Sequence, residues 1–492
     1  MNTTRKAWLT LAMLTSVSLA GCAVGPDYVA KDSSLALPTA FPSIASADLR
    51  VSSQPSRWWE GFNDAILNDL VDRAWSANFD VRSASAHLES ALAEVRATKG
   101  EFFPSLSADE SIGRSRQSEL TSTTGTPDTA TPTTASLGLS WQLDLFGRIR
   151  RSVELANADA SAQERARDDM RRLIVGQVVR TYAELRGNQE ELQLARERAS
   201  DAQVLCTITE VDGAAGRASA QDVALARANV ASIQADIPSL EARVRSALDH
   251  LASLVAVKLD DPLMAELARP QSLSVPVFVT VDTPSDLLKR RPDVRAAERK
   301  VAAATARIGI QTADLYPDLS IGGVLGFGAL APRRLGSDAS RLWSGGVDVS
   351  WTPFNGGATR ARIRAAGAAA DAALADYDKT MAVALEEADV AINEYVTAAH
   401  RDKLISQSSQ EVSNVYAVRK AEFEAGRASR RSLLSAGQDD RIARSSAVGA
   451  RTDLELRIVD MYTAFAGGMD APPKQSEARS SAPATEDNTA QR

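Results

Sequence analysis

A tandem duplication constrains the fold of this chain more than any other feature of its sequence. The segments 80–107 and 293–320 share nine identities without a gap, starting with Asp-Val-Arg in each copy. The pentapeptide Ala-Gly-Arg-Ala-Ser occurs at 215–219 and again, letter for letter, at 425–429. Because the same signals follow in the same order, the two halves must share one structural plan.

Each half contains two segments in which apolar and polar residues alternate. In the clearest one, Leu137, Leu139 and Trp141 alternate with glycine, serine and glutamine. This period of two predicts a strand with one apolar and one polar face. Strands are expected at about 104–115, 135–146, 317–328 and 343–354. An ordinary sheet on a globular core has the same pattern, but a length of about a dozen residues also suits a tilted membrane crossing.

Aromatic residues flank these four segments, as they do at the interfaces of a membrane barrel. The set consists of Phe102, Phe103, Trp141, Tyr316, Trp343 and Trp351. Open sheet edges are not viable in lipid, so several copies must close the sheet. Two copies give the minimum of eight strands, and three give twelve. The apolar faces would then meet lipid and the polar faces a lumen, with the polar connection at 117–134 as an extracellular loop.

Two long proline-free stretches predict unusually long helices. They run from Gly147 to about Ala215 and from Gly356 to about Ala425. At 1.5 Å per residue each would span on the order of 100 Å, which favours coiled-coil-like packing. The repeated pentapeptide marks a reversal of the chain, because a glycine there suits a helix C-terminus and a serine suits the next N-cap. Helical hairpins are therefore expected at about 147–255 and 356–468.

The N-terminus carries an export signal. Basic residues precede a short apolar run at 7–17, followed by Leu-Ala-Gly and then Cys22. The apolar run is too short to span a membrane as a retained helix. The tetrad resembles the bacterial lipobox, which predicts cleavage before Cys22 and acylation of that residue; the alternative is an ordinary signal peptide with a chance cysteine. Stable anchoring requires more than one acyl chain. No later segment offers 18 apolar residues in a row.

Composition argues against nucleic-acid binding, metal chemistry and catalysis. The net charge is −7, and only three histidines, His87, His250 and His400, are present. Serine-hydrolase, zinc-protease and phosphate-loop motifs do not occur. Cys206 is expected to be a small buried residue of a helix. We therefore expect no enzyme activity, cofactor, metal or nucleic-acid partner.

The chain resembles the TolC-like outer-membrane factors, specifically the NodT-type lipoproteins of RND tripartite efflux systems. The similarity extends from Cys22 to about Gly468 and is carried by four segments. These are Cys-Ala-Val-Gly-Pro-Asp-Tyr at 22–28, Trp58-Trp59 with Phe62 and Leu67, Leu-Phe-Gly-Arg at 145–148, and Asp-Leu-Leu-Lys-Arg-Arg-Pro-Asp-Val-Arg-Ala-Ala-Glu at 286–298. The resemblance implies a mainly α fold with a membrane β-barrel portion. Three chains would form a twelve-stranded barrel and a periplasmic α-helical barrel.

The resemblance also implies a function. The chain would be a passive conduit in the outer membrane, exporting drugs or other small molecules from the periplasm and an inner-membrane pump. Its partners would be two further copies, a periplasmic adaptor, an inner-membrane RND transporter and outer-membrane lipid. The alternatives are the outer-membrane channel of a type I secretion system and a periplasmic coiled-coil adaptor lipoprotein. An adaptor, however, would have one helical hairpin flanked by β-rich domains.

Five segments organise the chain in this interpretation. They are a signal peptide at 1–21, a lipidated N-terminal and equatorial segment at 22–78, the repeats at 79–290 and 291–470, and a disordered tail at 471–492.

The repeated pentapeptides would form the periplasmic tip. Each is at least a turn, and the turns would also dock the adaptor through Gly216, Arg217, Ser219, Gly426, Arg427 and Ser429. Candidates for the gate are Asp222, Arg430, Arg431, Ser432 and Ser435. The family often has acidic residues where Ser432 and Ser435 stand, so these two positions supply no carboxylates for a cation-binding acidic ring. Asp222 is expected to contact Arg430 or Arg431.

Overall fold

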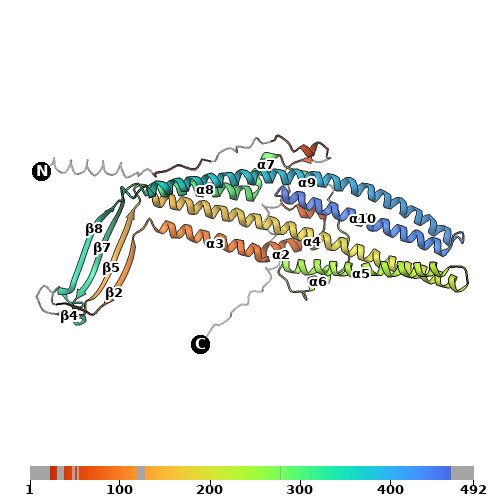
Figure 1. Cartoon of the computed structure of the whole chain (residues 1–492), viewed down its shortest axis with the longest axis horizontal. Helices are drawn as coiled ribbons and strands as arrows, with labels where there is room; N and C mark the ends of the chain where they lie inside the picture. Colours follow the sequence, from red (N-terminus) through yellow and green to blue (C-terminus); the bar gives the residue numbers. More distant parts are fainter. Residues whose placement is uncertain are drawn as a thin grey trace, which may run out of the picture. The chain divides into compact units, whose positions relative to one another are not determined.

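The computed structural model describes residues 23–29, 38–46, 50–52, 55–118, 128–276 and 279–466 (Figure 1). The predicted signal peptide, Cys22 and the predicted disordered tail lie outside the described residues. The chain divides into two compact units. The first comprises Met1–Leu35, Ala86–Arg165 and Asp293–Thr380, and the second comprises Ala36–Ser85, Ala166–Pro292 and Met381–Arg492. Each unit therefore takes segments from both sequence repeats.

The first unit contains a four-stranded antiparallel sheet in the order β2-β5-β7-β8 (Figure 1). Its strands are β2 (Ser105–Ile112), β5 (Thr133–Leu143), β7 (Asp318–Ala329) and β8 (Arg341–Ser350). A short hairpin of β3 (Ser115–Gln117) and β4 (Asp128–Ala130) lies between β2 and β5 in the chain. All four alternating segments thus form strands.

Two of the strands end earlier than the alternation predicts. β5 stops at Leu143 because the Asp144 carboxylate accepts backbone hydrogen bonds from Ile149 and Arg150, each 3.0 Å long, and so caps the following helix. β8 stops at Ser350 rather than 354, and Pro353 lacks the N–H that a strand ladder requires. Trp351 consequently lies just beyond β8.

Cross-strand pairing gives the sheet one polar and one apolar face. Directly paired residues project to the same face of a sheet. One row across all four strands is Ser105, Ser140, Gly322 and Gly346, and another on the same face is Ser107, Gly138, Val324 and Ser344. The opposite face carries rows such as Ala108, Leu137, Leu325 and Trp343. The polar positions of all four strands are therefore in phase.

The helices repeat with equal lengths in the two halves. Helices α3 (Phe79–Gly100) and α8 (Pro292–Ala313) each have 22 residues. Helices α4 (Arg148–Ala214) and α9 (Ala358–Glu424) each have 67, and α5 (Ala220–Leu254) and α10 (Arg430–Ala464) each have 35. In the first unit, small residues let the helices pack closely, as where Ala158 of α4 meets Ala302 and Ala303 of α8. Among the described residues, no helix is both long and apolar enough to cross a membrane.

The second unit has the larger hydrophobic core, and the Trp58-Trp59 motif is part of it. This motif opens the short helix η2 (Trp58–Phe62), which precedes α2 (Ala65–Ala77). Both tryptophans are buried, and the Trp58 ring stacks on Tyr462 of α10 with 4.9 Å between centroids. Asp64 caps α2 and accepts a 2.7 Å hydrogen bond from the Tyr182 hydroxyl. The motif is therefore a core element rather than a binding site.

Short elements complete the second unit. They are η1 (Pro42–Ser46), the parallel pair β1 (Arg50–Val51) and β6 (Thr280–Val281), α6 (Pro262–Leu267) and α7 (Pro284–Arg290). The charged motif at 286–298 begins in α7, and buried Arg291, directly after this helix, donates to the Ala464 carbonyl and pairs with Glu387 at 2.7 Å. Its neighbour Arg290 pairs with Asp282 at 2.9 Å. These arginines fasten α7 to the core.

Candidate functional site

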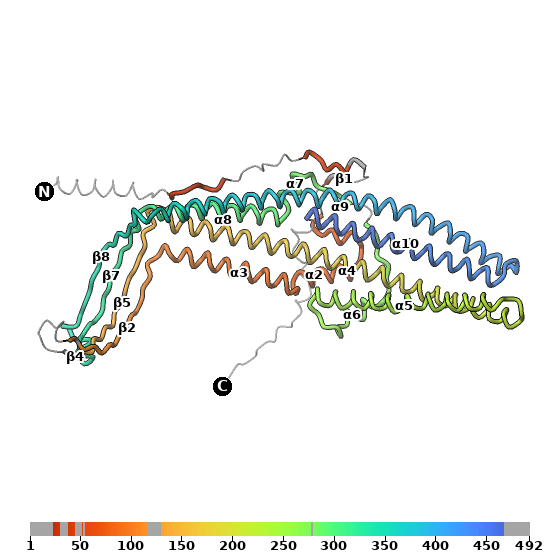
Figure 2. The backbone as a smooth tube through the Cα atoms, in the orientation of Figure 1, coloured from red at the N-terminus to blue at the C-terminus, as the bar shows by residue number. Residues whose placement is uncertain are grey.

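Two helical turns in the second unit carry the repeated pentapeptide, and Figure 2 shows both at the same end of this unit. Gly216 and Gly426 have φ values of +69° and +70°, which L side chains rarely adopt. The following arginine N–H closes each turn on a carbonyl five residues earlier: Arg217 on Asp212 at 2.7 Å and Arg427 on Glu422 at 2.8 Å. A Cβ at either glycine would meet nothing within 4 Å, so backbone conformation rather than space selects glycine.

Serine side chains start both returning helices. Ser219 Oγ accepts the Asp222 N–H at 3.1 Å, and the Asp222 carboxylate accepts the Ser219 N–H at 2.9 Å, forming a capping box. Ser429 Oγ accepts the Ser432 N–H at 3.2 Å. Hydrogen bonds from Ser219 lower the pKa of Asp222. The carboxylate that was expected to bond Arg430 or Arg431 thus serves mainly as a helix cap.

The acidic partner of Arg431 is Asp212, near the end of α4. Arg431 donates to Asp212 Oδ2 at 2.8 Å and to Thr209 Oγ1 at 3.0 Å. The other oxygen, Asp212 Oδ1, accepts from Arg217 at 2.8 Å. Hydrogen bonds from Arg217 and Arg431 lower the pKa of Asp212. We call this four-residue cluster of Thr209, Asp212, Arg217 and Arg431 the tip lock, because it joins the first helical turn to α10.

Sequence reasoning missed Asp212, although the duplication contains a signal for it. The equivalent position in the second half is Glu422, so an acidic residue precedes both pentapeptides by the same distance. Glu422 pairs with Arg419 at 2.8 Å. Among the predicted tip residues, Arg427 and Arg430 are exposed, and Ser435 lies one helical turn beyond Arg431 along α10. The tip lock therefore forms on one of two related turns.

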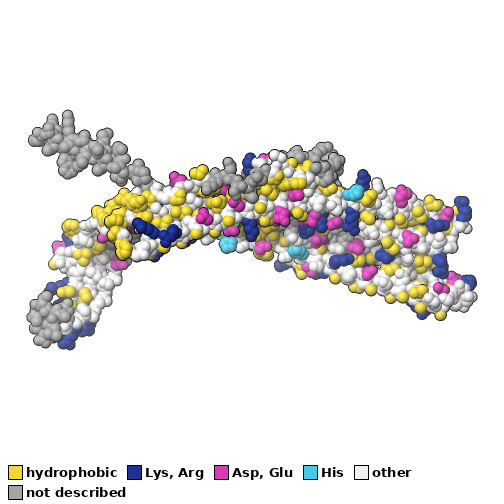
Figure 3. Space-filling view, turned by 45° about the horizontal axis from the view of Figure 1, so that its top comes forward, with side chains coloured by type: hydrophobic (Ala, Val, Ile, Leu, Met, Phe, Trp, Pro, Cys, Tyr) yellow, Lys and Arg dark blue, Asp and Glu magenta, His cyan; other side chains and the backbone are white. Residues whose placement is uncertain are grey.

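The predicted aromatic residues gather mostly at the helix end of the sheet in the first unit. The Trp141 indole donates to the Phe102 carbonyl at 2.9 Å, and the Trp351 indole donates to the Leu315 carbonyl at 3.1 Å. The Tyr316 ring stacks on Phe146 with 4.7 Å between centroids. Hydrophobic side chains cover the surface around this junction (Figure 3).

Trp343 is the exception to this arrangement. It is the third residue of β8, opposite Leu325, and its side chain is 81% exposed. Because β8 runs toward the helices, Trp343 lies toward the other end of the sheet. Most of the aromatic residues therefore lie at the end of the sheet next to the helices, and Trp343 lies toward the other end.

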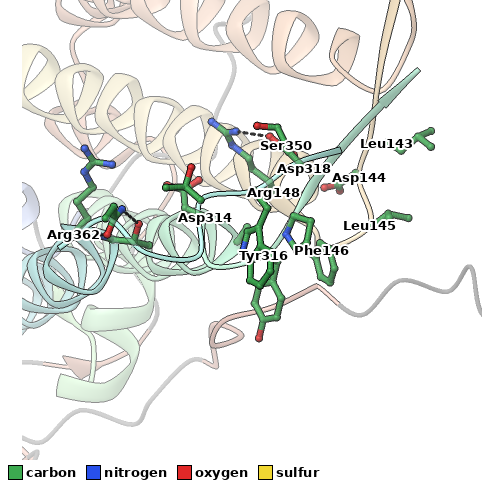
Figure 4. Close-up of a pocket in the computed structure, with 16 residues that line it drawn as sticks. Leu143, Asp144, Leu145, Phe146, Arg148, Asp314, Tyr316, Asp318, Ser350 and Arg362 are labelled. Atoms are coloured by element: carbon green, nitrogen blue, oxygen red, sulfur yellow. Dashed lines mark hydrogen bonds and ion pairs between the residues drawn. The ribbon is translucent and has the colours of Figure 1, made fainter. Parts of the chain in front are cut away.

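A polar cavity of about 310 Å³ opens at the same junction (Figure 4). Asp318, at the start of β7, accepts from Gln142 at 2.8 Å and from Arg148 at 3.4 Å. Asp314 and Arg362 add charges of both signs to the lining. This cavity places polar and charged groups beside the polar face of the sheet.

The segment Ala23–Val29 is also bound at this junction. Arg151 of α4, only 4% exposed, donates to the Val24 and Gly25 carbonyls at 3.2 Å each and pairs with Asp27 at 2.7 Å. The Val24 N–H bonds the Phe146 carbonyl at 3.1 Å. A Cβ at Gly147 would lie 2.6 Å from Ala23 Cα, so only glycine permits this approach. Cys22 itself lies outside the described residues but is joined to Ala23 by a peptide bond.

Few of the possible metal ligands and thiols in the described part of the chain suit metal binding or thiol chemistry. Within the described ranges, no group of three or more His, Cys, Asp or Glu side chains is placed to hold a metal ion. Cys206 is buried in α4 against Val230 and Ile233 of α5, as the sequence predicts. It packs as an apolar residue.

Comparison with known proteins places these features in context. The family model described as "Outer membrane efflux protein" matches residues 70–257 and 283–467. Nodulation protein T of Rhizobium leguminosarum bv. viciae is 28% identical over 467 residues, which cover 94% of each chain. The antibiotic efflux pump outer membrane protein ArpC of Pseudomonas putida is 28% identical over 94% of this chain and 96% of its own. The solved outer-membrane channel OprN superposes with a TM-score of 0.80 and 32% identity, over 91% of this chain and all of its own.

Proposed function

Because the chain belongs to the outer membrane efflux protein family, we propose that three copies form one passive conduit from the periplasm to the exterior. The sheet carries this proposal. Within the described residues, β2 pairs with β5 on one side only and β8 likewise with β7, leaving two exposed edges. Three four-stranded sheets joined at these edges make a closed barrel of twelve strands, wide enough for water. Closure also satisfies the edge groups in lipid.

The two faces of the sheet fit this barrel. The rows containing Leu137 and Leu325 would face lipid, and the serine- and glycine-rich rows would face the lumen. The aromatic residues at the helix end would lie at the periplasmic interface, where amphipathic rings are favoured. The polar cavity beside Asp318 and Arg148 would then lie at the inner mouth of the barrel.

The helical turns would form the periplasmic end and dock an adaptor. Three chains present six turns, and the exposed Arg217 and Arg427 can donate to carboxylates or carbonyls of a partner protein. Energy would come from an inner-membrane transporter, since the conduit needs no chemistry of its own. The efflux cargo implied by relatives such as ArpC is a small molecule.

Light scattering on detergent-extracted protein tests the central proposal. We expect a particle of three chains, and we expect the same gene to restore drug efflux to a strain that lacks its outer-membrane channel. A monomer in detergent, or a trimer that restores no efflux, contradicts the proposal.

Opening the tip lock should raise single-channel conductance. Arg431→Ala removes the bonds to Thr209 and Asp212 that hold α10 against the first turn, so the tip should widen and conductance in planar bilayers should rise several-fold. The matched control is Arg430→Ala, the exposed neighbour on the same helix. Equal conductance of the two variants would show that the lock does not restrict the opening.

The same lock predicts a pH dependence. The pKa of Asp212 is lowered by its arginine partners, so the carboxylate stays charged and the ion pairs persist from neutral pH down through the range where an ordinary aspartate titrates. They are lost as the pH falls through the lowered pKa, and conductance should rise only there. Asp212→Asn should abolish that acid response and conduct well already at neutral pH. An unchanged acid response in this variant would place the titrating group elsewhere.

Cys22→Ser should remove the lipid and leave the trimer. The proposal that Cys22 is acylated gains support from the bound segment after it, because Arg151 and Phe146 hold residues 23–27 beside the aromatic junction. The sheet itself supplies the main membrane contact, so the variant should incorporate no radioactive palmitate yet still give heat-resistant trimer in membrane fractions. Label retained by the variant would refute acylation at Cys22.

A further inference from the structure

The duplication extends to the hydrogen-bonding register of the strands. In the first half β2 pairs Ser105 with Ser140 of β5, and in the second β7 pairs Asp318 with Ser350 of β8. A residue of β2 corresponds to the residue of β7 that lies 213 positions later, and a residue of β5 corresponds to the residue of β8 that lies 210 positions later. These two offsets convert the first pair, Ser105 with Ser140, into the second, Asp318 with Ser350. The same offsets relate two hydrogen bonds made by tryptophan side chains. The bond from Trp141 to the Phe102 carbonyl corresponds to the bond from Trp351 to the Leu315 carbonyl.

The β5–β7 ladder shows how a second strand meets the first strand of the following half. In this ladder Leu137 pairs with Leu325, Gly138 with Val324, Leu139 with Gly323 and Ser140 with Gly322. In a ring of three chains, β8 is the second strand of its half and lies beside β2 of the next copy, which is the first strand of the half that follows. This contact between chains is therefore equivalent to the contact between β5 and β7 within one chain. Applying the offsets to the β5–β7 pairs therefore gives the pairs at the boundary between chains.

We propose that β8 of one copy pairs antiparallel with β2 of the next in this inherited register. Val347 then lies opposite Ile112, Asp348 opposite Ser111, Val349 opposite Glu110 and Ser350 opposite Asp109. We call this boundary the seam. The inference rests on the proposed trimer and adds to it the atomic register of the contact.

Side-chain chemistry supports this register independently of the duplication. Asp109 and Ser111 belong to the polar face of β2, and Asp348 and Ser350 belong to the polar face of β8, so the polar face continues across the seam. Ile112 and Val347, which are 65% and 63% exposed in the single chain, meet on the apolar face. Glu110 is the exception on that face. A slip of one residue would pair polar with apolar positions throughout.

Slips of two residues preserve the faces but are disfavoured for other reasons. One direction places Asp109 directly opposite Asp348, and like charges directly opposite are destabilising. The other direction places Ser350 opposite Ser111 and Asp348 opposite Gly113, which lies beyond the end of β2. That register retains fewer strand pairs at the seam. The inherited register keeps the two aspartates from lying directly opposite each other and retains more pairs between β2 and β8 than the second slip does.

Disulfide trapping tests the seam directly. Asp109→Cys with Ser350→Cys is introduced into one chain that also carries Cys206→Ser, and cells are oxidised before non-reducing electrophoresis. Directly opposite positions have Cβ atoms about 4.5–5.5 Å apart, close enough for a disulfide after small adjustments. Because every copy carries both cysteines, we expect covalent dimers and a covalent ring of three chains. Reduction should return them to monomers.

Matched pairs make each outcome decisive. Ser105→Cys with Ser140→Cys, which are paired within one chain, reports the oxidation efficiency at the same sheet. Asp109→Cys with Asp348→Cys, and Ser111→Cys with Ser350→Cys, represent the two slips and should link at least ten-fold less than the proposed pair. Preferential linking of either slipped pair overturns the register, as does no linking between chains when the intrachain pair forms. A monomer in light scattering overturns the trimer itself, which separates failure of the seam from failure of the proposed function.

Discussion

Replacing Gly216 and Gly426 together by proline should abolish efflux while leaving trimer in the outer membrane. Both glycines have φ near +70°, whereas proline fixes φ near −65°. Proline also lacks the N–H that Gly216 donates to the Gly213 carbonyl and Gly426 to the Phe423 carbonyl, each at 2.9 Å. Both turns must therefore change shape, and the proposed docking edge for the adaptor would be lost.

The control is the pair Gly216→Asn with Gly426→Asn. Asparagine tolerates the left-handed conformation, and a side chain at either position would meet open space. This variant should retain most of the efflux. Drug accumulation, crosslinking to the adaptor and heat-resistant trimer are measured for both variants. Wild-type export and normal crosslinking by the double proline variant would show that the turns do not form the docking edge.

Arginine at Leu139 should impair trimer assembly far more than arginine at the adjacent Ser140. Leu139 lies near the middle of β5 on the apolar face, between Leu106 and Gly323. A lipid-facing arginine near the bilayer midplane costs about 2–4 kcal/mol per chain. Ser140 lies on the polar face, between Ser105 and Gly322, where glycine and serine residues line a hollow of about 460 Å³. An arginine there would extend into water.

Heat-resistant trimer in membrane fractions and channel conductance measure the difference. We expect Leu139→Arg to lose most of its trimer, whereas Ser140→Arg should keep its trimer and conduct less. Equal losses of trimer in the two variants would contradict the assignment of one face of the sheet to lipid and the other to water. Loss in Ser140→Arg alone would reverse the assignment of lipid and lumen.

Local periodicity explains how much of the fold the sequence predicted. Alternation of period two located all four strands of the sheet, and the absence of proline located α4 and α9 to within a few residues. The repeated glycine and serine located both turns because a left-handed backbone favours glycine and an N-cap position favours serine. The resemblance to TolC-like outer-membrane channels is confirmed by the family match and by the superposition on OprN.

Strand ends were less predictable, because they depend on competition between neighbouring elements. Alternation continues through Asp144 and Leu145, yet the Asp144 carboxylate caps α4 and ends β5 at Leu143. Similarly, the apolar residue Trp351 fits the alternation but lies beyond β8. The first strand ends at a helix-capping hydrogen bond and the second before a proline that lacks an N–H, and a pattern of hydrophobicity encodes neither.

The sequence by itself thus determined the duplication, the elements and their turns, since each depends on residues close together in the chain. Only the tertiary structure decided which residues that lie far apart in the chain come into contact. Arg431 reaches Asp212 across 219 positions of sequence, and Arg151 holds Asp27 across 124. The strand order likewise places β5 beside β7. Such contacts have no period, because they arise when separate helices and strands pack to satisfy charges and backbone groups that no single element can satisfy alone.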